Sequence, residues 1–292
     1  MGNIWKWFVL VLLLTGCGGN PDYVPVPTPE LPPPYTGETC MSANALLLAG
    51  GTPLIAVDAA DFDGTNDYMS RAGLSGVSSS KSGILSFWYR IDGGNATART
   101  LLEADDTPGA AVRFQVQQAA DNKIWLNGYN SADATILALN STAYAAAGTW
   151  LHILSAWDLA NNVSSLYING VSDQVAYRVN DFIAYTGVTD TALGSSPGGS
   201  LKINGCLAEF YFAPNQYLDF SVEANRRKFI SGAGGKPVHL GVDGSLPTGT
   251  APAIYQHLDN EEAVANFATN RGTGGNFTIT GTLDTASTSP SD

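Results

Sequence analysis

The sequence has few charged side chains, and most of its charges are negative. Asp, Glu, Lys and Arg make up only 14% of the 292 residues, and 26 acidic against 14 basic side chains give a net charge of −12. An acidic chain of this kind repels phosphate backbones, so nucleic acid is not expected as a partner. A helical bundle would need a surface rich in Lys and Glu, so this composition favours an all-β protein with many turns.

Histidine is scarce, and no catalytic motif is complete. None of the three histidines lies in a His-Glu-x-x-His pattern: His152, His239 and His257. Glu103-Ala104-Asp105 begins like the glucanase strand pattern Glu-x-Asp-x-(x)-Glu, but the final Glu is missing and Pro108 follows, so we interpret it as a solvated turn. Gly194-Ser195-Ser196-Pro197-Gly198 has the spacing of a nucleophile elbow, yet Pro197 has no N–H to donate to an oxyanion. The sequence therefore predicts no catalytic residues.

One apolar run stands at the N-terminus. Lys6 precedes the run from Trp7 to Leu14, which ends in Leu14-Thr15-Gly16-Cys17 and is too short to span a bilayer. This segment resembles the signal and lipobox of bacterial lipoproteins, which implies that residues 1–16 are removed and Cys17 is lipidated. An exported protein held in the cell envelope, at the outer membrane, is then expected. The alternatives are an uncleaved anchor or a plain signal peptide.

Only three cysteines are present. If Cys17 carries lipid, Cys40 and Cys206 are left as an even pair in an oxidising compartment, and we predict a disulfide between them. The alternative is two buried free thiols.

Residues 20–36 contain seven prolines, a density that excludes helix and sheet and favours extended polyproline II. We expect residues 17–36 to form the lipidated cysteine and a spacer, 37–213 a folded body, and 214–292 a C-terminal extension.

The body shows the period-two alternation of strands. Val112, Phe114 and Val116 alternate with polar residues, and similar patterns occur at 85–91, 123–126, 151–157 and 165–168. Asn127-Gly128 and Asn169-Gly170 are typical of type I′ hairpin turns. Short strands at this spacing indicate a sandwich of two sheets.

Five motifs follow one another in a fixed order. They begin with Asp61-Phe62-Asp63-Gly64-Thr65-Asn66-Asp67-Tyr68 and continue at 83–90, 148–153, 166–171 and 204–212. The series resembles the laminin-G-like, concanavalin A-like jelly roll over about 54–213. The fold class predicted is therefore all-β, a jelly-roll sandwich of two antiparallel sheets. Beyond it we expect a short helix from Val222 to Ile230, capped by Ser221, in an extension that packs on the sandwich.

The resemblance also suggests binding sites. Such jelly rolls often hold calcium on a rim loop, and an oxygen-rich group is available in Asp61, Asp63, Asn66 and Asp67, although these residues also suit a plain turn. Sugar rings stack on exposed aromatics, and Trp125, Tyr129 and Tyr144 lie near predicted turns. Trp88, Trp150 and His152 fall at positions that the family uses for packing.

These features together favour a surface-tethered, non-catalytic recognition module that binds a glycan or a surface protein. A phage or prophage structural or host-interaction protein, located in the virion, is the alternative. A polysaccharide lyase or glycoside hydrolase with an unrecognised site is the third hypothesis.

Overall fold

The computed structural model describes residues 56–292 except 95, 107–110, 143–146 and 233–234. Contacts divide the chain into two units, residues 1–43 and 44–292, and all described residues lie in the second. Among them, no helix is long and apolar enough to cross a membrane. Cys17, Cys40 and Tyr144 lie outside the described residues, so the predictions made for them are not tested by the structure.

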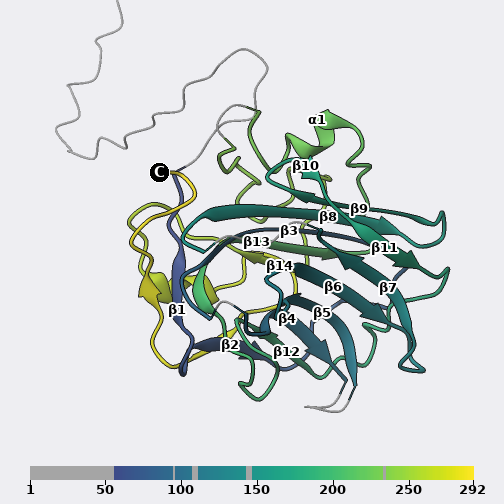
Figure 1. Cartoon of the computed structure of the whole chain (residues 1–292), viewed down its shortest axis with the longest axis horizontal. Helices are drawn as coiled ribbons and strands as arrows, with labels where there is room; N and C mark the ends of the chain where they lie inside the picture. Colours follow the sequence, from purple (N-terminus) through teal and green to yellow (C-terminus); the bar gives the residue numbers. More distant parts are fainter. Residues whose placement is uncertain (1–55, 95, 107–110, 143–146, 233–234) are drawn as a thin grey trace, which may run out of the picture. The chain divides into compact units, whose positions relative to one another are not determined.

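The described chain forms two eight-stranded sheets in which every pairing between named strands is antiparallel, and the predicted all-β sandwich is confirmed (Figure 1). The first sheet runs, in order, β10 (Val171–Ser172), β9 (Val163–Ile168), β8 (Trp150–Asp158), β3 (Ser82–Ile91), β13 (Asn204–Pro214), β1 (Ala60–Asp63) and β16 (Asp284–Thr285), with β14 (Ile254–Gln256) also paired to β13. The second runs β11 (Val175–Arg178), β7 (Thr135–Asn140), β6 (Ile124–Tyr129), β5 (Val112–Gln118), β4 (Arg99–Asp105), β12 (Asp190–Leu193), β2 (Tyr68–Arg71) and β15 (Thr278–Thr280).

The core lies between the two sheets and is rich in stacked aromatic rings. The Phe114 ring on β5 lies 4.8 Å from the Phe212 ring on β13 and 5.4 Å from the Trp157 ring on β8, and all three side chains are fully buried. Offset stacking adds to the free energy of burying these large side chains. The alternation predicted from the sequence thus reflects strands with one face in the core.

One predicted hairpin turn is instead part of a strand. Asn127-Gly128 lies inside β6, and the chain turns only afterwards, at Asn130–Ala134. A Cβ at Gly128 would lie 2.7 Å from the Ile183 side chain, so the glycine is required by close packing and not by a turn. Asn169-Gly170 does turn, with φ values of 51° and 78°.

The C-terminal segment, which is the chain after β13, covers the outer face of the first sheet. Phe220, Phe229 and Leu240 are buried against Tyr211 and other outward-facing side chains of that sheet.

The predicted helix is much shorter than expected: α1 spans only Glu223–Arg226, and no side chain caps it. Tertiary packing explains the difference, because consecutive Phe229 and Ile230 are both buried beyond the helix end. A second helical turn, η1 (Val264–Ala268), is of the 3₁₀ type.

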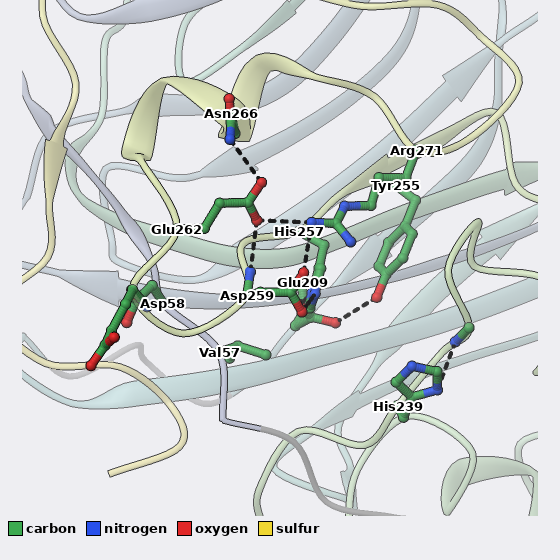
Figure 2. A network of polar contacts seen from close by, with 12 residues as sticks. Val57, Asp58, Glu209, His239, Tyr255, His257, Asp259, Glu262, Asn266 and Arg271 are labelled. Carbon is green, nitrogen blue, oxygen red and sulfur yellow. Dashed lines mark hydrogen bonds and ion pairs between the residues drawn. The ribbon is translucent and has the colours of Figure 1, made fainter. Parts of the chain in front are cut away.

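A buried polar network joins this segment to β13 (Figure 2). His257 is 4% exposed and contacts the Glu209 carboxylate through Nδ1, while its Nε2 lies 2.9 Å from Asp259 Oδ1. The Tyr255 hydroxyl donates to Glu209 over 3.0 Å, and Arg271 pairs with Asp259 at 3.1 Å. Both ring nitrogens face carboxylates, an arrangement that favours the imidazolium, in which both nitrogens donate. Burial opposes that charge, but the two carboxylates outweigh it and raise the pKa of His257.

Glu209 reaches this network from a β-bulge. The pairing of β13 with β3 shifts between Ala208 and Tyr211, and Glu209 has a φ of 49°, in the left-handed region. A bulge leaves one extra residue in its strand and re-aims its side chain, at a conformational cost of about 1–3 kcal/mol. The hydrogen bonds from Tyr255 and His257 offset that cost.

Candidate functional site

The outer face of the second sheet carries a group of polar and aromatic side chains. On β6, Ile124, Leu126 and Gly128 point into the core, so Trp125, Asn127 and Tyr129 point outward. In Figure 1 the strands β5, β6, β7 and β11 lie side by side in this sheet. We call the outward side chains of β4, β5, β6, β7 and β11 the open sheet face: Glu103, Gln115, Gln117, Trp125, Asn127, Tyr129, Asn140 and Tyr177.

Three aromatic side chains surround Asn127 on the open sheet face. Trp125 and Tyr129 are its neighbours two positions away on β6, so their backbones are about 13 Å apart at ~3.3 Å per residue. Tyr177 lies two strands away, opposite Ala138 on β7. Trp125 is 36% and Tyr177 54% exposed, while Tyr129 is half-buried. The structure therefore brings two predicted ligand residues, Trp125 and Tyr129, onto one face with Tyr177, which sequence analysis missed.

Glu103 is the titratable group of this face. The register aligns Glu103, Gln115 and Asn127 in one row across β4, β5 and β6, and the Gln115 amide donates to the Glu103 carboxylate. Glu103 is only 5% exposed, and burial, together with the charge of Asp105, raises its pKa to about 7 although the Gln115 hydrogen bond opposes the shift. Burial and the nearby Glu103 carboxylate also raise the pKa of Tyr129.

The interpretation of Glu103-Ala104-Asp105 as a solvated turn is therefore wrong. These residues end strand β4, and Glu103 and Asp105 are buried at 5% and 1% exposure on the same side of it. The sequence suggested a turn because Asp-Asp-Thr-Pro follows, but the strand continues up to Asp105 through its pairing with β5 and β12.

Hydrogen-bonding groups remain available on the open sheet face. The side-chain amides of Asn127 and Asn140 bond to no described residue, and Asn140 Oδ1 is also buried. Gln117 donates to Thr100 over 3.3 Å, which leaves its carbonyl oxygen free to accept.

Arg113 closes one end of the face. Its guanidinium pairs with Asp106 and Asp133 and donates to the Asn130 carbonyl at 2.8 Å, although the side chain is nearly buried. Burial disfavours its charge, but the two carboxylates outweigh this effect and raise the pKa of Arg113. The cation is thus engaged in structure and holds the β6–β7 turn against β5.

The predicted calcium ligands are divided in the structure. Asp63 Oδ1 accepts the backbone N–H groups of Thr65, Asn66 and Asp67; burial raises the pKa of Asp63, but these hydrogen bonds together outweigh it and lower the pKa. Asp67 accepts from the N–H of Thr282. These carboxylates thus order a turn, and calcium binding there stays a prediction.

Asp61 faces another group, with Asp92 and Cys206, whose ligand atoms lie within 4.8 Å of one another. Arg90 is ion-paired to Asp92 at 2.7 Å and also reaches the Cys206 sulfur, so this mixed set does not fit calcium, which prefers oxygen ligands alone. Burial and the neighbouring carboxylates raise the pKa of the Cys206 thiol. Cys206 is a free, buried thiol in the described structure, and its pairing with Cys40 stays a prediction.

The residues assigned to packing behave differently from one another. His152 is fully buried, with Nε2 2.9 Å from Ser86 Oγ, and burial lowers its pKa to about 3. Trp88 is 4% exposed and lies against the His152 ring. Trp150 is only half-buried, because it lies where β8 begins.

The open sheet face has the composition of a carbohydrate-recognition surface. Aromatic rings can stack on the apolar C–H faces of sugars, while amide and carboxyl groups exchange hydrogen bonds with hydroxyls. The alternation of apolar and polar residues could have identified Gln115, Asn127 and Tyr177 as outward-facing positions of their strands. Only the register between strands shows which of these outward residues are neighbours.

Comparison with known proteins supports the fold. The family model described as the concanavalin A-like lectin/glucanases superfamily (Laminin_G_3) matches residues 63–215, just over half of the chain. No curated protein sequence matches the chain.

Among solved structures, a candidate carbohydrate-binding protein of Bacteroides ovatus is similar, with a TM-score of 0.52 and 11% identity over 80% of this chain and 60% of that one. The chain thus spans less than two thirds of that protein. Domain 4 of an extracellular arabinanase of Geobacillus stearothermophilus, in complex with arabinotriose, has a TM-score of 0.41 and 18% identity over 56% of this chain and 73% of the other. Mouse laminin α1 domains LG4-5 have a TM-score of 0.41 and 17% identity over 57% of this chain and 43% of theirs.

Proposed function

Since the chain belongs to the concanavalin A-like lectin/glucanases superfamily, we propose that it is a non-catalytic recognition protein that binds glycan through the open sheet face. The observation that carries the proposal is the arrangement of Trp125, Tyr129 and Tyr177 around the unbonded amide of Asn127. Rings provide stacking surfaces, and the amide provides a donor and an acceptor between them.

The chemistry of the face suits binding better than bond cleavage. Hydrolysis of a glycosidic bond uses two carboxyl groups on opposite sides of the bond. Glu103 and Asp105 lie on the same side of β4, as the first two carboxylates of the glucanase pattern do, but the final Glu of that pattern is missing from the sequence, and Gln115 already donates a hydrogen bond to Glu103. We assign Glu103 the role of accepting or donating a hydrogen bond to a sugar hydroxyl, depending on its protonation.

A glycan array with the purified protein tests the proposal, followed by titration of the best-bound glycan. We expect Trp125→Ala to weaken binding about tenfold, the loss typical of an aromatic residue at an interface centre. Tyr217→Ala, which removes a 37% exposed aromatic outside the face, is the matched control and should bind normally. Equal binding by the Trp125 variant would refute the assignment. Release of shortened sugar during incubation would instead indicate a hydrolase or lyase.

We further propose that the protein is exported and anchored by a lipid on Cys17, with residues 17–36 as a spacer that holds the body away from the membrane. Expression in a bacterium with a labelled fatty acid should label the wild-type chain and not Cys17→Ala. An unlabelled wild type with an intact N-terminus would contradict this proposal and leave the glycan test unaffected.

A further inference from the structure

A cavity lies on the other layer of the sandwich, at the outer side of the first sheet. It is a cavity of about 350 Å³ lined by Trp88, Trp150, Asn169, Lys236, Ser289 and Asp292, among others. These residues come from β3, the start of β8, the β9–β10 turn, the loop after α1 and the last residues of the chain. Small-ligand sites in proteins have volumes of roughly 300–1,000 Å³, so the size suits a small ligand.

The aromatic wall of this cavity is held in place. The Trp150 indole N–H donates to Thr288 Oγ1 over 3.2 Å, and the Arg90 guanidinium carbon lies 5.5 Å from the centre of its ring. Trp88 lies against the His152 ring at 4.8 Å. Side chains fixed in this way lose little conformational entropy when a ligand binds.

Lys236 gives the cavity an unusual charge. Every other Lys or Arg side chain of the described residues has a hydrogen bond or ion pair, whereas the Lys236 ammonium has neither. Its backbone N–H donates to Ser231 Oγ over 2.8 Å, which positions the residue at the cavity. In a chain with a net charge of −12, no carboxylate of the described residues forms an ion pair with it, although Asp292 lines the same cavity. An ammonium left unpaired in a cavity favours an anionic ligand.

The remaining polar groups suit hydroxyls. Asp292 accepts hydrogen bonds from the Ser289 N–H and hydroxyl and retains further lone pairs, and Asn169 and Ser289 line the same cavity. Indole surface, hydroxyl-binding groups and one free cation are together the complement of a sugar ring that carries a carboxylate.

We propose that this cavity binds an acidic saccharide, a uronic or sialic acid residue, with the sugar carboxylate at the Lys236 ammonium and the ring against the Trp150 indole. The site is separate from the open sheet face and does not depend on it. The carboxylate of the ligand replaces water around Lys236, and Asp292 accepts from a ring hydroxyl.

Matched probe pairs test this site on the purified full chain: cellobiouronic acid with cellobiose, and sialyllactose with lactose. Calorimetry and tryptophan fluorescence should show saturable binding of at least one acidic probe, at least tenfold tighter than its neutral partner and weakened by salt. Lys236→Met should reduce that affinity at least tenfold without changing the unfolding midpoint. Lys81→Met, the same change at another lysine, and Trp125→Ala should bind the acidic probe normally.

Each other outcome overturns the proposal. Failure of both acidic probes to bind, equal affinity for acidic and neutral sugars, or unchanged affinity in Lys236→Met would exclude an acidic-saccharide site here. Loss of acidic binding in Trp125→Ala alone would place that ligand on the open sheet face and support the function proposed there. The Trp125 and Lys236 variants therefore distinguish glycan binding on the open sheet face from acidic-saccharide binding in the cavity.

Discussion

Replacing Glu103 by Gln removes the buried titratable group of the open sheet face and should flatten the pH dependence of stability. Burial raises the pKa of Glu103 from its ordinary 4.5 to about 7, so the folded chain holds this proton more tightly than the unfolded chain does. The sign follows from linkage: relative to acidic solution, folding loses free energy as the pH rises from 4.5 through 7, because a buried carboxylate must then ionise.

The size of the effect follows from the shift. At about 1.4 kcal/mol per pKa unit, a rise from 4.5 to about 7 amounts to about 3 kcal/mol of stability lost between pH 4 and pH 8. Glutamine is nearly isosteric, cannot ionise and can still accept from the Gln115 amide, so Glu103→Gln keeps the contact and removes only the charge.

Urea unfolding of the wild type and Glu103→Gln at several pH values between 4 and 8 measures the difference. Other groups that titrate in this range contribute equally to both proteins, so their effects cancel when the two proteins are compared. Glu261→Gln, the same change at an exposed glutamate, is the control and should follow the wild type. A stability difference between wild type and Glu103→Gln that stays constant with pH would refute the assignment of a raised pKa to this carboxyl.

Three further predictions concern buried residues of the two sheets and of the segment packed on them. Gly128→Ala should lower the free energy of unfolding by about 1–3 kcal/mol, because its Cβ would meet Ile183; an unchanged urea midpoint would show that this side chain yields freely. His257→Leu leaves the Glu209 carboxylate buried without its ion pair and should cost about 3–5 kcal/mol in the same measurement, whereas a loss below 1 kcal/mol would contradict the network. Because the pKa of His152 is about 3, its NMR ring signals should not shift between pH 5 and 8, and a midpoint near 6.5 would disprove its burial as a neutral ring.

Much of the body could be predicted because strand alternation records burial directly. Val112, Phe114 and Val116 alternate with polar residues, and the sandwich that they indicated is the fold observed. The helix expected from Val222 to Ile230 was wrong in length, because Phe229 and Ile230 are buried in two separate clusters beyond the helix end while Val222 is exposed, so the segment has no single apolar helical face.

The binding residues were predictable only in part. Trp125 and Tyr129 were selected because they are aromatic and near supposed turns, yet they are outward residues of a single strand, and the supposed turn at Asn127 lies between them. Glu103 was dismissed because local sequence after it favours a turn, whereas pairing with two neighbouring strands extends β4 through Asp105.

The order of motifs and the alternation of apolar residues by themselves determined the class of fold, because both are local along the chain. Only the tertiary structure decided which residues share a surface. Glu103, Gln115 and Asn127 come from three strands and are neighbours because the strand register aligns them. Trp150, Lys236 and Asp292 come from distant segments and line one cavity on the outer side of the first sheet. Neighbours of this kind depend on pairing between distant segments, and nothing in the sequence around any one of them encodes it.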